Sequence, residues 1–257
     1  FPFLRTTTVL IFFSLTVSAT VPLSERNALV ELYTATEGPK WSNGSTWLIG
    51  DPCLNNWFGI FCDADDTHVI EVFPNPRHSG NIMKGAIPHS FWTDLPMLEQ
   101  IYLSNDIPFG ASSLQGNGSS FIACPGLNMM PALTHFFFYY TTLTQNIPPE
   151  IGNLTQLKCL YLSHAGKLTG TLPTEMSKLI HMQGLFLRWN HFEGALPDLS
   201  KMRNLTKLVI DGAPVKACPV SMIVAEAKKS RVCCGCCLMS SGVDHEREQE
   251  QWHTTFN

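Results

Sequence analysis

The sequence predicts an α/β solenoid, in which short repeats stack and contribute one strand each to a parallel β-sheet. Apolar residues recur at a period of 24 between positions 145 and 217. The copy that opens at Gly170 has apolar residues at Leu172, Met176, Leu179, Met182, Leu185 and Leu187, then Asn190 and Phe192. The segment Leu185-Phe186-Leu187 is typical of a short strand whose side chains alternate between two faces. Because a single copy cannot bury its own leucines, neighbouring copies are expected to stack around one continuous core.

The spacing within each copy is the L-x-x-L-x-L-x-x-N-x-L signature of a leucine-rich repeat. Two weaker copies lie upstream, one from Gly85 and one from Phe121 to Thr144. Residues 106–120 between them are rich in Gly and Ser and are predicted to form an inserted surface loop. Residues 69–217 then hold about five repeats, more than the roughly three that a stable stack needs.

The first 19 residues are predicted to be a secretory signal peptide. Arg5 precedes an apolar run from Val9 to Val17, and Val17-Ser18-Ala19 offers a cleavage site. The run is too short to span a bilayer. A buried hydrophobic strand is the alternative interpretation.

Four Asn-x-Ser/Thr sequons agree with a secreted, extracellular glycoprotein. Two of them, at Asn153 and Asn204, fall between the Pro and the strand of their repeats, which predicts a place on the convex side. The full set of candidate glycosylation sites is Asn43, Asn117, Asn153 and Asn204.

Residues 20–68 are predicted to cap the first repeat, whose apolar end would otherwise face water. Ser24 is a candidate N-cap for a helix that follows it. Three tryptophans can plug the end of the leucine core, namely Trp41, Trp47 and Trp57. A disulfide between Cys53 and Cys62 would close a loop of about ten residues and contribute roughly 2.7 kcal/mol in the chain-entropy model.

The cap and repeats together resemble a known family. The pattern W…W…DPC…W-x-G-I-x-C between Trp41 and Cys62, followed by 24-residue repeats, is similar to the extracellular region of plant-type leucine-rich-repeat proteins. This family includes receptor-like proteins, receptor kinases and secreted polygalacturonase inhibitors. The resemblance covers about residues 24–217. It implies a right-handed, curved solenoid that recognises peptides, proteins or glycans on its concave sheet. The chain departs from the pattern at Thr141 and Ala165, which replace the repeat Asn, in its short array and in its C-terminal segment.

The C-terminal segment, residues 218–257, is predicted to contain a cap and a charged tail. Its cluster Cys233, Cys234, Cys236 and Cys237 admits three interpretations: disulfides, one of them to Cys218; palmitoylation; or a metal site. Lipidation of this cluster, or a longer parent protein, would bring membrane association. The nine cysteines are an odd number, so at least one is free or intermolecular, with Cys159 and Cys124 as candidates.

Motifs for catalysis are missing from the sequence. It contains no Gly-rich phosphate loop, no G-x-S-x-G elbow, no H-E-x-x-H and no kinase motif set. We therefore expect no enzyme, no catalytic residue, no cofactor and no metal. A net charge of −4 without a basic stripe also argues against nucleic acid as a partner.

The periodicity of the strands indicates a candidate binding surface instead. The residue between the last two leucines of each repeat should project from the concave face, which gives the column Tyr102, Phe137, Tyr161, Phe186 and Val209. Flanking positions add Gln100, His135, Tyr139, His164, Arg188 and Trp189. The candidate ligand-binding residues are Tyr102, Phe137, Tyr161, Phe186, Arg188 and Trp189.

An exposed aromatic stripe of this kind favours recognition of an extracellular protein, peptide or glycan. The alternative for the stripe itself is cross-strand stacking that stabilises the sheet without any ligand. Two other functions stay open for the chain. It could inhibit an extracellular cell-wall hydrolase, or it could be a structural matrix glycoprotein.

Overall fold

A computed structural model describes residues 20–74, 81, 83–104, 130–139, 143–162, 166–210 and 231–234. Several predictions concern residues outside this set. They are the signal peptide, the inserted loop, the charged tail, Asn117, Thr141, His164, Ala165, Cys124, Cys218, Cys236 and Cys237, together with the side chains of Cys233 and Cys234.

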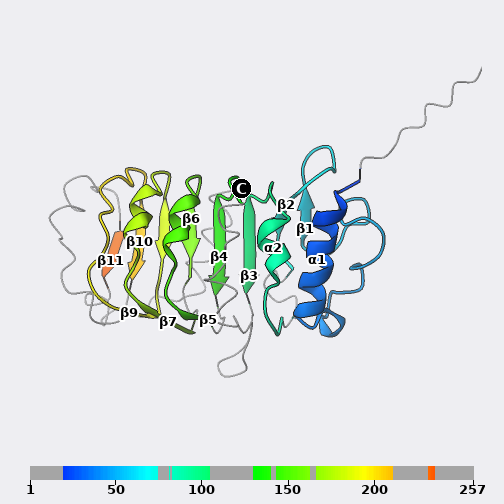
Figure 1. Cartoon of the computed structure of the whole chain (residues 1–257), viewed down its shortest axis with the longest axis horizontal. Helices are drawn as coiled ribbons and strands as arrows, with labels where there is room; N and C mark the ends of the chain where they lie inside the picture. The colour runs from blue at the N-terminus through cyan, green and yellow to red at the C-terminus, as the bar shows by residue number, and fades with distance from the viewer. Residues whose placement is uncertain are drawn as a thin grey trace, which may run out of the picture.

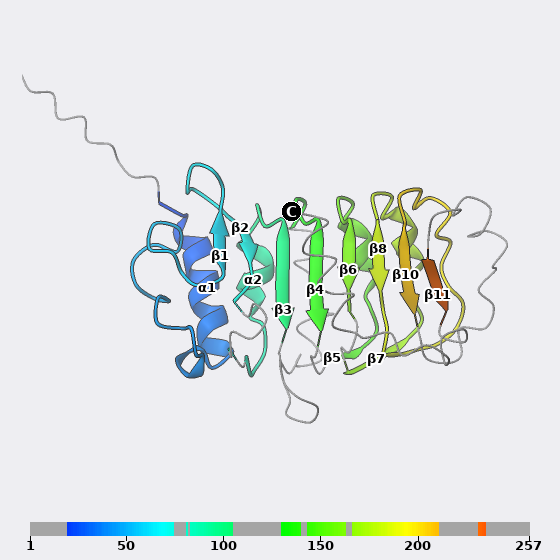
Figure 2. The ribbon, with the colours of Figure 1, turned by 180° about the vertical axis from the view of Figure 1, so that it is seen from behind.

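An eight-stranded sheet runs along the whole length of the described chain, and Figure 2 looks onto it. Its strand order is β1-β2-β3-β4-β6-β8-β10-β11. Pairing is parallel from β2 onward, and only β1 and β2 in the cap are antiparallel. The parallel sheet predicted for the repeats is therefore confirmed. The strands are β1 (Ile60–Cys62), β2 (Val69–Val72), β3 (Gln100–Ser104), β4 (His135–Tyr139), β6 (Cys159–Tyr161), β8 (Gly184–Phe186), β10 (Lys207–Ile210) and β11 (Arg231–Cys234).

A second sheet was not predicted from the sequence. It has three parallel strands, β5 (Leu143–Gln145), β7 (Gly166–Gly170) and β9 (His191–Phe192), and it follows the lower edge of the molecule in Figure 1. These segments are two to five residues long. They are too short for the alternating pattern that indicates a strand.

Helical segments cover the other side of the main sheet and lie in front of it in Figure 1. They are α1 (Leu23–Ala35), η1 (Gly38–Lys40), α2 (His89–Thr93), η3 (Pro149–Asn153) and η4 (Thr174–Lys178). The prediction of Ser24 as an N-cap is wrong. The N-cap is Pro22, without a side-chain hydrogen bond, and Ser24 lies in the first turn of α1. Proline suits a helix start because its ring fixes φ and its missing N–H would have no partner within the helix there.

The core is a continuous row of apolar side chains between the two sides. Leu160, Leu185 and Leu208 are neighbours in register on β6, β8 and β10, and all three are buried. One cluster of packed residues extends from Val21 in the cap to Ile210 in β10. The stacking of repeats around one core is as the sequence predicts.

The repeat Asn bonds to the backbone of two turns at Asn190. Its side-chain Nδ2 donates to the carbonyl oxygens of Leu162 at 2.7 Å and Leu187 at 3.1 Å. Because Leu162 belongs to the preceding repeat, this buried amide ties consecutive turns together and satisfies carbonyls that the sheet leaves unpaired.

Candidate recognition surface on the concave face

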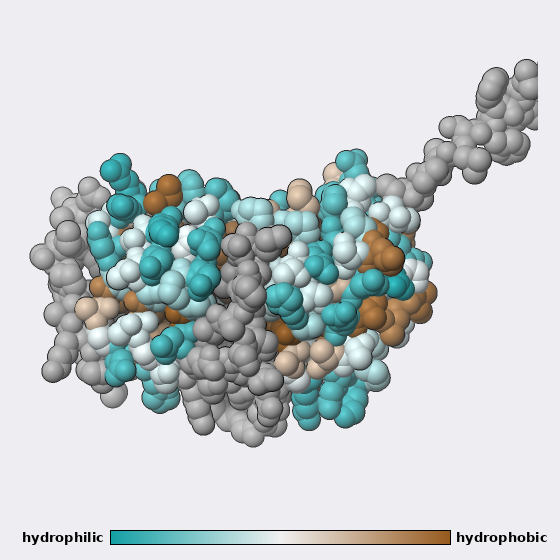
Figure 3. All heavy atoms as spheres, in the orientation of Figure 1, coloured by the Kyte–Doolittle hydropathy of each residue, from teal (hydrophilic) through white to brown (hydrophobic). Residues whose placement is uncertain are grey.

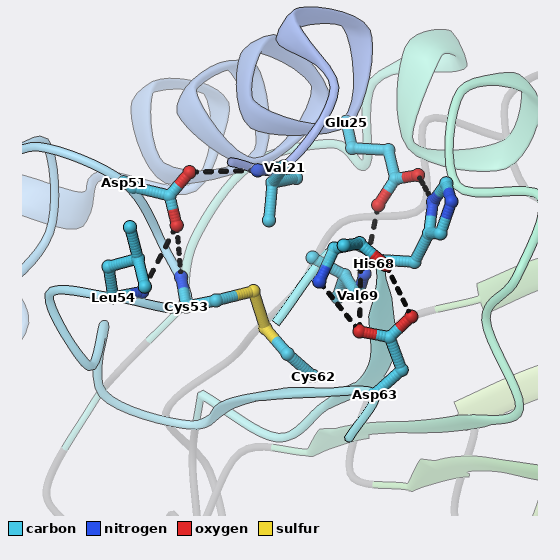
Figure 4. The surroundings of a disulfide bond; sticks show 10 residues. Val21, Glu25, Asp51, Cys53, Leu54, Cys62, Asp63, His68 and Val69 are labelled. Atoms are coloured by element: carbon cyan, nitrogen blue, oxygen red, sulfur yellow. Dashed lines mark hydrogen bonds and ion pairs between the residues drawn. A yellow bond between two sulfur atoms is a disulfide. The ribbon is translucent and has the colours of Figure 1, made fainter. Parts of the chain in front are cut away.

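The cap fixes the first strand of the site through a disulfide and a set of buried hydrogen bonds (Figure 4). Cys53 and Cys62 are joined, as predicted, with their Cα atoms 5.9 Å apart. Nearby, the buried carboxylate of Glu25 on α1 accepts from the backbone N–H of Val69 at 2.9 Å and contacts His68 Nδ1 at 2.6 Å. These bonds attach the cap helix to the start of β2.

The three tryptophans plug the end of the solenoid as predicted. Trp41, Trp47 and Trp57 are all buried, and neighbouring rings have centroids 5.2 to 5.3 Å apart. Each indole N–H finds a backbone carbonyl: that of Thr36, Phe58 or Ile49, respectively. The apolar end of the stack is therefore closed without an unsatisfied indole.

On the concave face the predicted aromatic column is a continuous stack of rings. Strand register pairs Tyr102 with Phe137, Phe137 with Tyr161, and Tyr161 with Phe186. The successive ring centroids are 4.5, 5.9 and 5.1 Å apart, with interplanar angles of 10°, 25° and 26°. Val209 follows Phe186 in register. The parallel sheet has placed four rings from four repeats face to face.

Phe73 adds a fifth ring that sequence reasoning missed. It follows β2, and its ring lies 4.9 Å from Tyr102 at an angle of 43°. The register between Val72 and Ile101 puts Phe73 next to Tyr102. The signal available in the sequence was that Phe73 follows Val72, an apolar residue of an inward-facing strand position, and so falls on the outward face. We call the five residues Phe73, Tyr102, Phe137, Tyr161 and Phe186 the aromatic ladder.

The ladder is less exposed than the sequence predicts. Tyr102, Phe137 and Tyr161 are half-buried, whereas Phe186 is buried, with 7% of its surface accessible. Because the rings stack on one another, their faces are used inside the ladder and their edges are left for a ligand. The ladder therefore has the cross-strand stacking that stabilises a sheet in addition to any role in recognition.

A second column of side chains runs beside the ladder on the same face. Gln100, His135, Cys159, Gly184 and Lys207 are neighbours in register from β3 to β10. The Tyr102 hydroxyl donates to Gln100 Oε1 at 2.8 Å and so joins the two columns. Cys159 is a buried free thiol, in agreement with its candidacy as the unpaired cysteine.

Burial keeps three titratable groups in the middle of this face, His135, Cys159 and Tyr102, in their neutral forms near pH 7. Burial, together with the charge of Lys158, lowers the pKa of His135 to about 4. Burial raises the pKa of the Cys159 thiol to about 12. The pKa of the Tyr102 hydroxyl is also raised, first by burial and then by the charge of Glu71. The middle of the concave face is thus uncharged.

Arg188 and Trp189, the remaining candidate residues, come directly after the strand β8 and Leu187. The guanidinium of Arg188 lies 5.1 Å from the ring of Trp189, within the range of a cation–π contact. Trp189 is about half exposed and has a φ of 61°, in the left-handed region that a bulky residue rarely adopts. The side chain of Tyr139 lies outside the described set.

The sequons differ in accessibility. Asn153, at the end of η3, and Asn204 are exposed, while Asn43 is half-buried with its backbone N–H bonded to Asn81. Glycosylation at these positions stays a prediction.

In the described part of the chain, no helix is long and apolar enough to cross a membrane. No group of three or more His, Cys, Asp or Glu side chains in this part of the chain is arranged to hold a metal ion.

The sequence and fold resemble those of known plant proteins. The chain is 38% identical over 79 residues to receptor-like protein 39 of Arabidopsis thaliana, a match that covers 30% of this chain and 8% of that protein. It is 35% identical over 122 residues to receptor-like protein 35 of the same plant, covering 46% of this chain and 12% of that protein. The chain therefore matches about a tenth of the length of these curated relatives. No family model matches the sequence.

Solved structures show the same fold. The ectodomain of the Arabidopsis receptor kinase GASSHO1/SCHENGEN3, in complex with CASPARIAN STRIP INTEGRITY FACTOR 2, superposes with a TM-score of 0.57 and 20% identity over 73% of this chain and 21% of that one. The fold is that of a plant leucine-rich-repeat ectodomain. This ectodomain fold also occurs in a plant ice-binding protein, with a TM-score of 0.56 and 20% identity over 75% of this chain and 64% of that one. The HAESA ectodomain gives a TM-score of 0.51 and 22% identity over 74% of this chain and 34% of that one.

Proposed function

We propose that this leucine-rich-repeat protein recognises an extracellular protein or peptide on its concave face, with the aromatic ladder as the central anchor. The observation that carries this proposal is the ladder itself, a row of rings that crosses five strands in the middle of the sheet. Aromatic side chains at the centre of a contact surface commonly supply most of its binding energy.

The ring geometry favours a protein or peptide over a glycan. A sugar ring stacks on the open face of an aromatic side chain, and in the ladder these faces lie against neighbouring rings at angles of 10° to 26°. The ring edges and the neutral side chains of Gln100, His135 and Cys159 beside them suit apolar side chains and backbone groups instead. Two of the similar structures support this class of partner, since the HAESA ectodomain was solved with a peptide hormone ligand and GASSHO1/SCHENGEN3 with CASPARIAN STRIP INTEGRITY FACTOR 2.

An extracellular, non-catalytic role fits the remaining observations. The curated relatives are receptor-like proteins. Exposed sequons at Asn153 and Asn204, away from the ladder, would carry glycans without covering it. Arg188 and Trp189 would extend the contact beyond β8.

The test is a binding measurement with concave-face variants. Secreted protein is screened against extracellular protein and peptide libraries, and hits are measured by calorimetry. Phe137→Ala and Tyr161→Ala should each weaken binding about 5- to 30-fold, which corresponds to roughly 1–2 kcal/mol. The control is Asn153→Gln, which removes an exposed sequon and should leave the affinity unchanged. A genuine partner that binds both ladder variants as tightly as wild type would place the interface elsewhere.

A further inference from the structure

Exposed apolar side chains concentrate in the cap. Of the eight large hydrophobic residues that are exposed in the described chain, five lie between residues 20 and 62. Figure 3 shows hydrophobic surface gathered at the cap end of this view, while the repeats beside it are mostly hydrophilic. The five are Leu23, Leu48, Ile49, Leu54 and Phe61. Contiguous exposed apolar surface of this kind marks interaction sites in soluble proteins.

Four of these residues lie on segments that hydrogen bonds join to one another, and we call Leu23, Leu48, Ile49 and Leu54 the cap patch. The carboxylate of Asp51 accepts from the backbone N–H of Val21 at 2.9 Å and of Leu54 at 3.1 Å, which brings the start of α1 beside the turn (Figure 4). Arg26 Nε donates to the Gly50 carbonyl at 2.9 Å. Leu23 lies one helical turn before Arg26 and therefore on the same face of α1 as that contact.

The turn that presents Leu48 and Ile49 is rigid. Trp57 Nε1 donates to the Ile49 carbonyl at 2.8 Å, and the next carbonyl is held by Arg26. Leu48 has a φ of 69°, in the left-handed region that disfavours a branched residue, yet 46% of its surface is exposed. Backbone strain of this kind persists at functional sites because the surrounding structure enforces it. A pre-ordered apolar turn also loses little conformational entropy when it binds.

Charge indicates which kind of surface the patch meets. Apart from Glu25, which is buried against His68, residues 20–74 carry seven acidic side chains (Glu31, Glu37, Asp51, Asp63, Asp65, Asp66 and Glu71) against two basic ones (Arg26 and Lys40). An anionic lipid surface would repel this cap, since membranes attract basic segments. A protein surface with an apolar stripe flanked by Lys or Arg would be attracted to it. We propose that the cap patch docks a second protein partner, whose surface is an apolar stripe flanked by basic residues.

The experiment uses a probe with that chemistry. A fluorescent amphipathic helical peptide of Leu and Lys, which presents an apolar stripe between lysines, is titrated into the full secreted chain. Saturable binding is expected, and the double variant Leu48→Ser/Ile49→Ser should weaken it at least tenfold. Raising the salt concentration should also weaken it. The matched control is Ile180→Ser, because Ile180 is an exposed aliphatic residue outside the cap and should leave the affinity unchanged.

Four results would overturn the proposal. The peptide could fail to bind, or it could bind the double variant and wild type equally. Phosphatidylcholine vesicles could bind wild type but not the double variant, which would assign the patch to a lipid surface. Self-association that the double variant abolishes, measured by analytical ultracentrifugation, would assign it to a second copy of the chain. Thermal unfolding of the double variant should match wild type, since both side chains are exposed.

Discussion

Replacing Phe186 with Ala tests how far the aromatic ladder contributes to stability. Phe186 has 7% of its surface accessible and stacks on Tyr161 at a centroid distance of 5.1 Å, although it lies on the concave side, outside the leucine core. A buried phenylalanine removes about 150–250 Å² from water, and truncation to Ala gives up roughly half to two thirds of that area. At about 25 cal/mol per Å² the loss is about 2–4 kcal/mol.

The assay is urea unfolding followed by circular dichroism, with Val209→Ala as the matched variant. Val209 is the next residue in the same column, is only half-buried and loses two methyl groups. Its substitution should cost less, about 0.5–1.5 kcal/mol. Phe186→Ala should lower the transition midpoint by about 1 M or more with an unchanged slope, for a slope of about 2 kcal/mol/M.

If Phe186→Ala loses no more stability than Val209→Ala, the ring is not packed in solution as it is in the structure. The stacking account of the ladder would then fail, and Phe186 would return to the exposed position that strand alternation predicts.

Four other predictions rest on separate parts of the fold. Leu185→Ala should cost about 2–5 kcal/mol in the same unfolding assay, because Leu185 is fully buried between neighbouring repeats; a value under 1 kcal/mol would contradict the continuous core. Reducing the Cys53–Cys62 bond should lower stability by about 2–3 kcal/mol, and mass spectrometry of a non-reduced digest should recover the linked peptides; free thiols at both positions would exclude the bond. Glu25→Gln should lower the free energy of unfolding by about 1–3 kcal/mol, because it leaves the backbone N–H of Val69 or the ring of His68 with a weaker partner. Unchanged stability would show that the buried carboxylate does not hold the cap. Finally, the fold lowers the pKa of His135 from 6.5 to about 4, so the unfolded chain takes up the proton first as the pH falls. The free energy of unfolding should therefore drop by about 1–2 kcal/mol between about pH 6.5 and 4, after allowance for the partial exposure of the ring. His135→Gln should remove that pH-dependent component.

Periodicity in the sequence was enough to predict the strands that the repeats contribute to the main sheet, their parallel pairing and the residues that share a column, but not β1 in the cap or β11 in the C-terminal segment. The reason is that inward leucines at a fixed spacing leave one register in which all of them are buried, as Leu160, Leu185 and Leu208 show. The buried tryptophans and the disulfide of the cap could also be predicted, because Trp and Cys side chains have few alternatives to the buried positions they occupy.

Other features depend on which residues become neighbours in the fold, and the sequence pattern of one segment does not show this. The second sheet consists of segments too short to have a period. Ser24 has the right residue type for an N-cap, but the helix begins two residues earlier than that cap would imply, and Pro22 is the N-cap. Alternation along a strand says that Phe186 points away from the core, but its burial depends on the rings and side chains of adjacent repeats. Exposure is therefore a tertiary property that a one-strand pattern cannot give.

This distinction bears directly on how the proposed recognition function should be tested. Every ring of the ladder supports its neighbours, so an alanine substitution anywhere in it lowers stability and can lower binding by loosening the face. Tyr161 and Phe186 separate the two effects, because Tyr161 is half-buried with an edge open to a ligand, whereas Phe186 is buried. If the ladder binds a partner, Tyr161→Ala should lose more affinity per unit of lost stability than Phe186→Ala does. If the ladder only stabilises the sheet, loss of affinity should follow loss of stability at both positions with the same ratio.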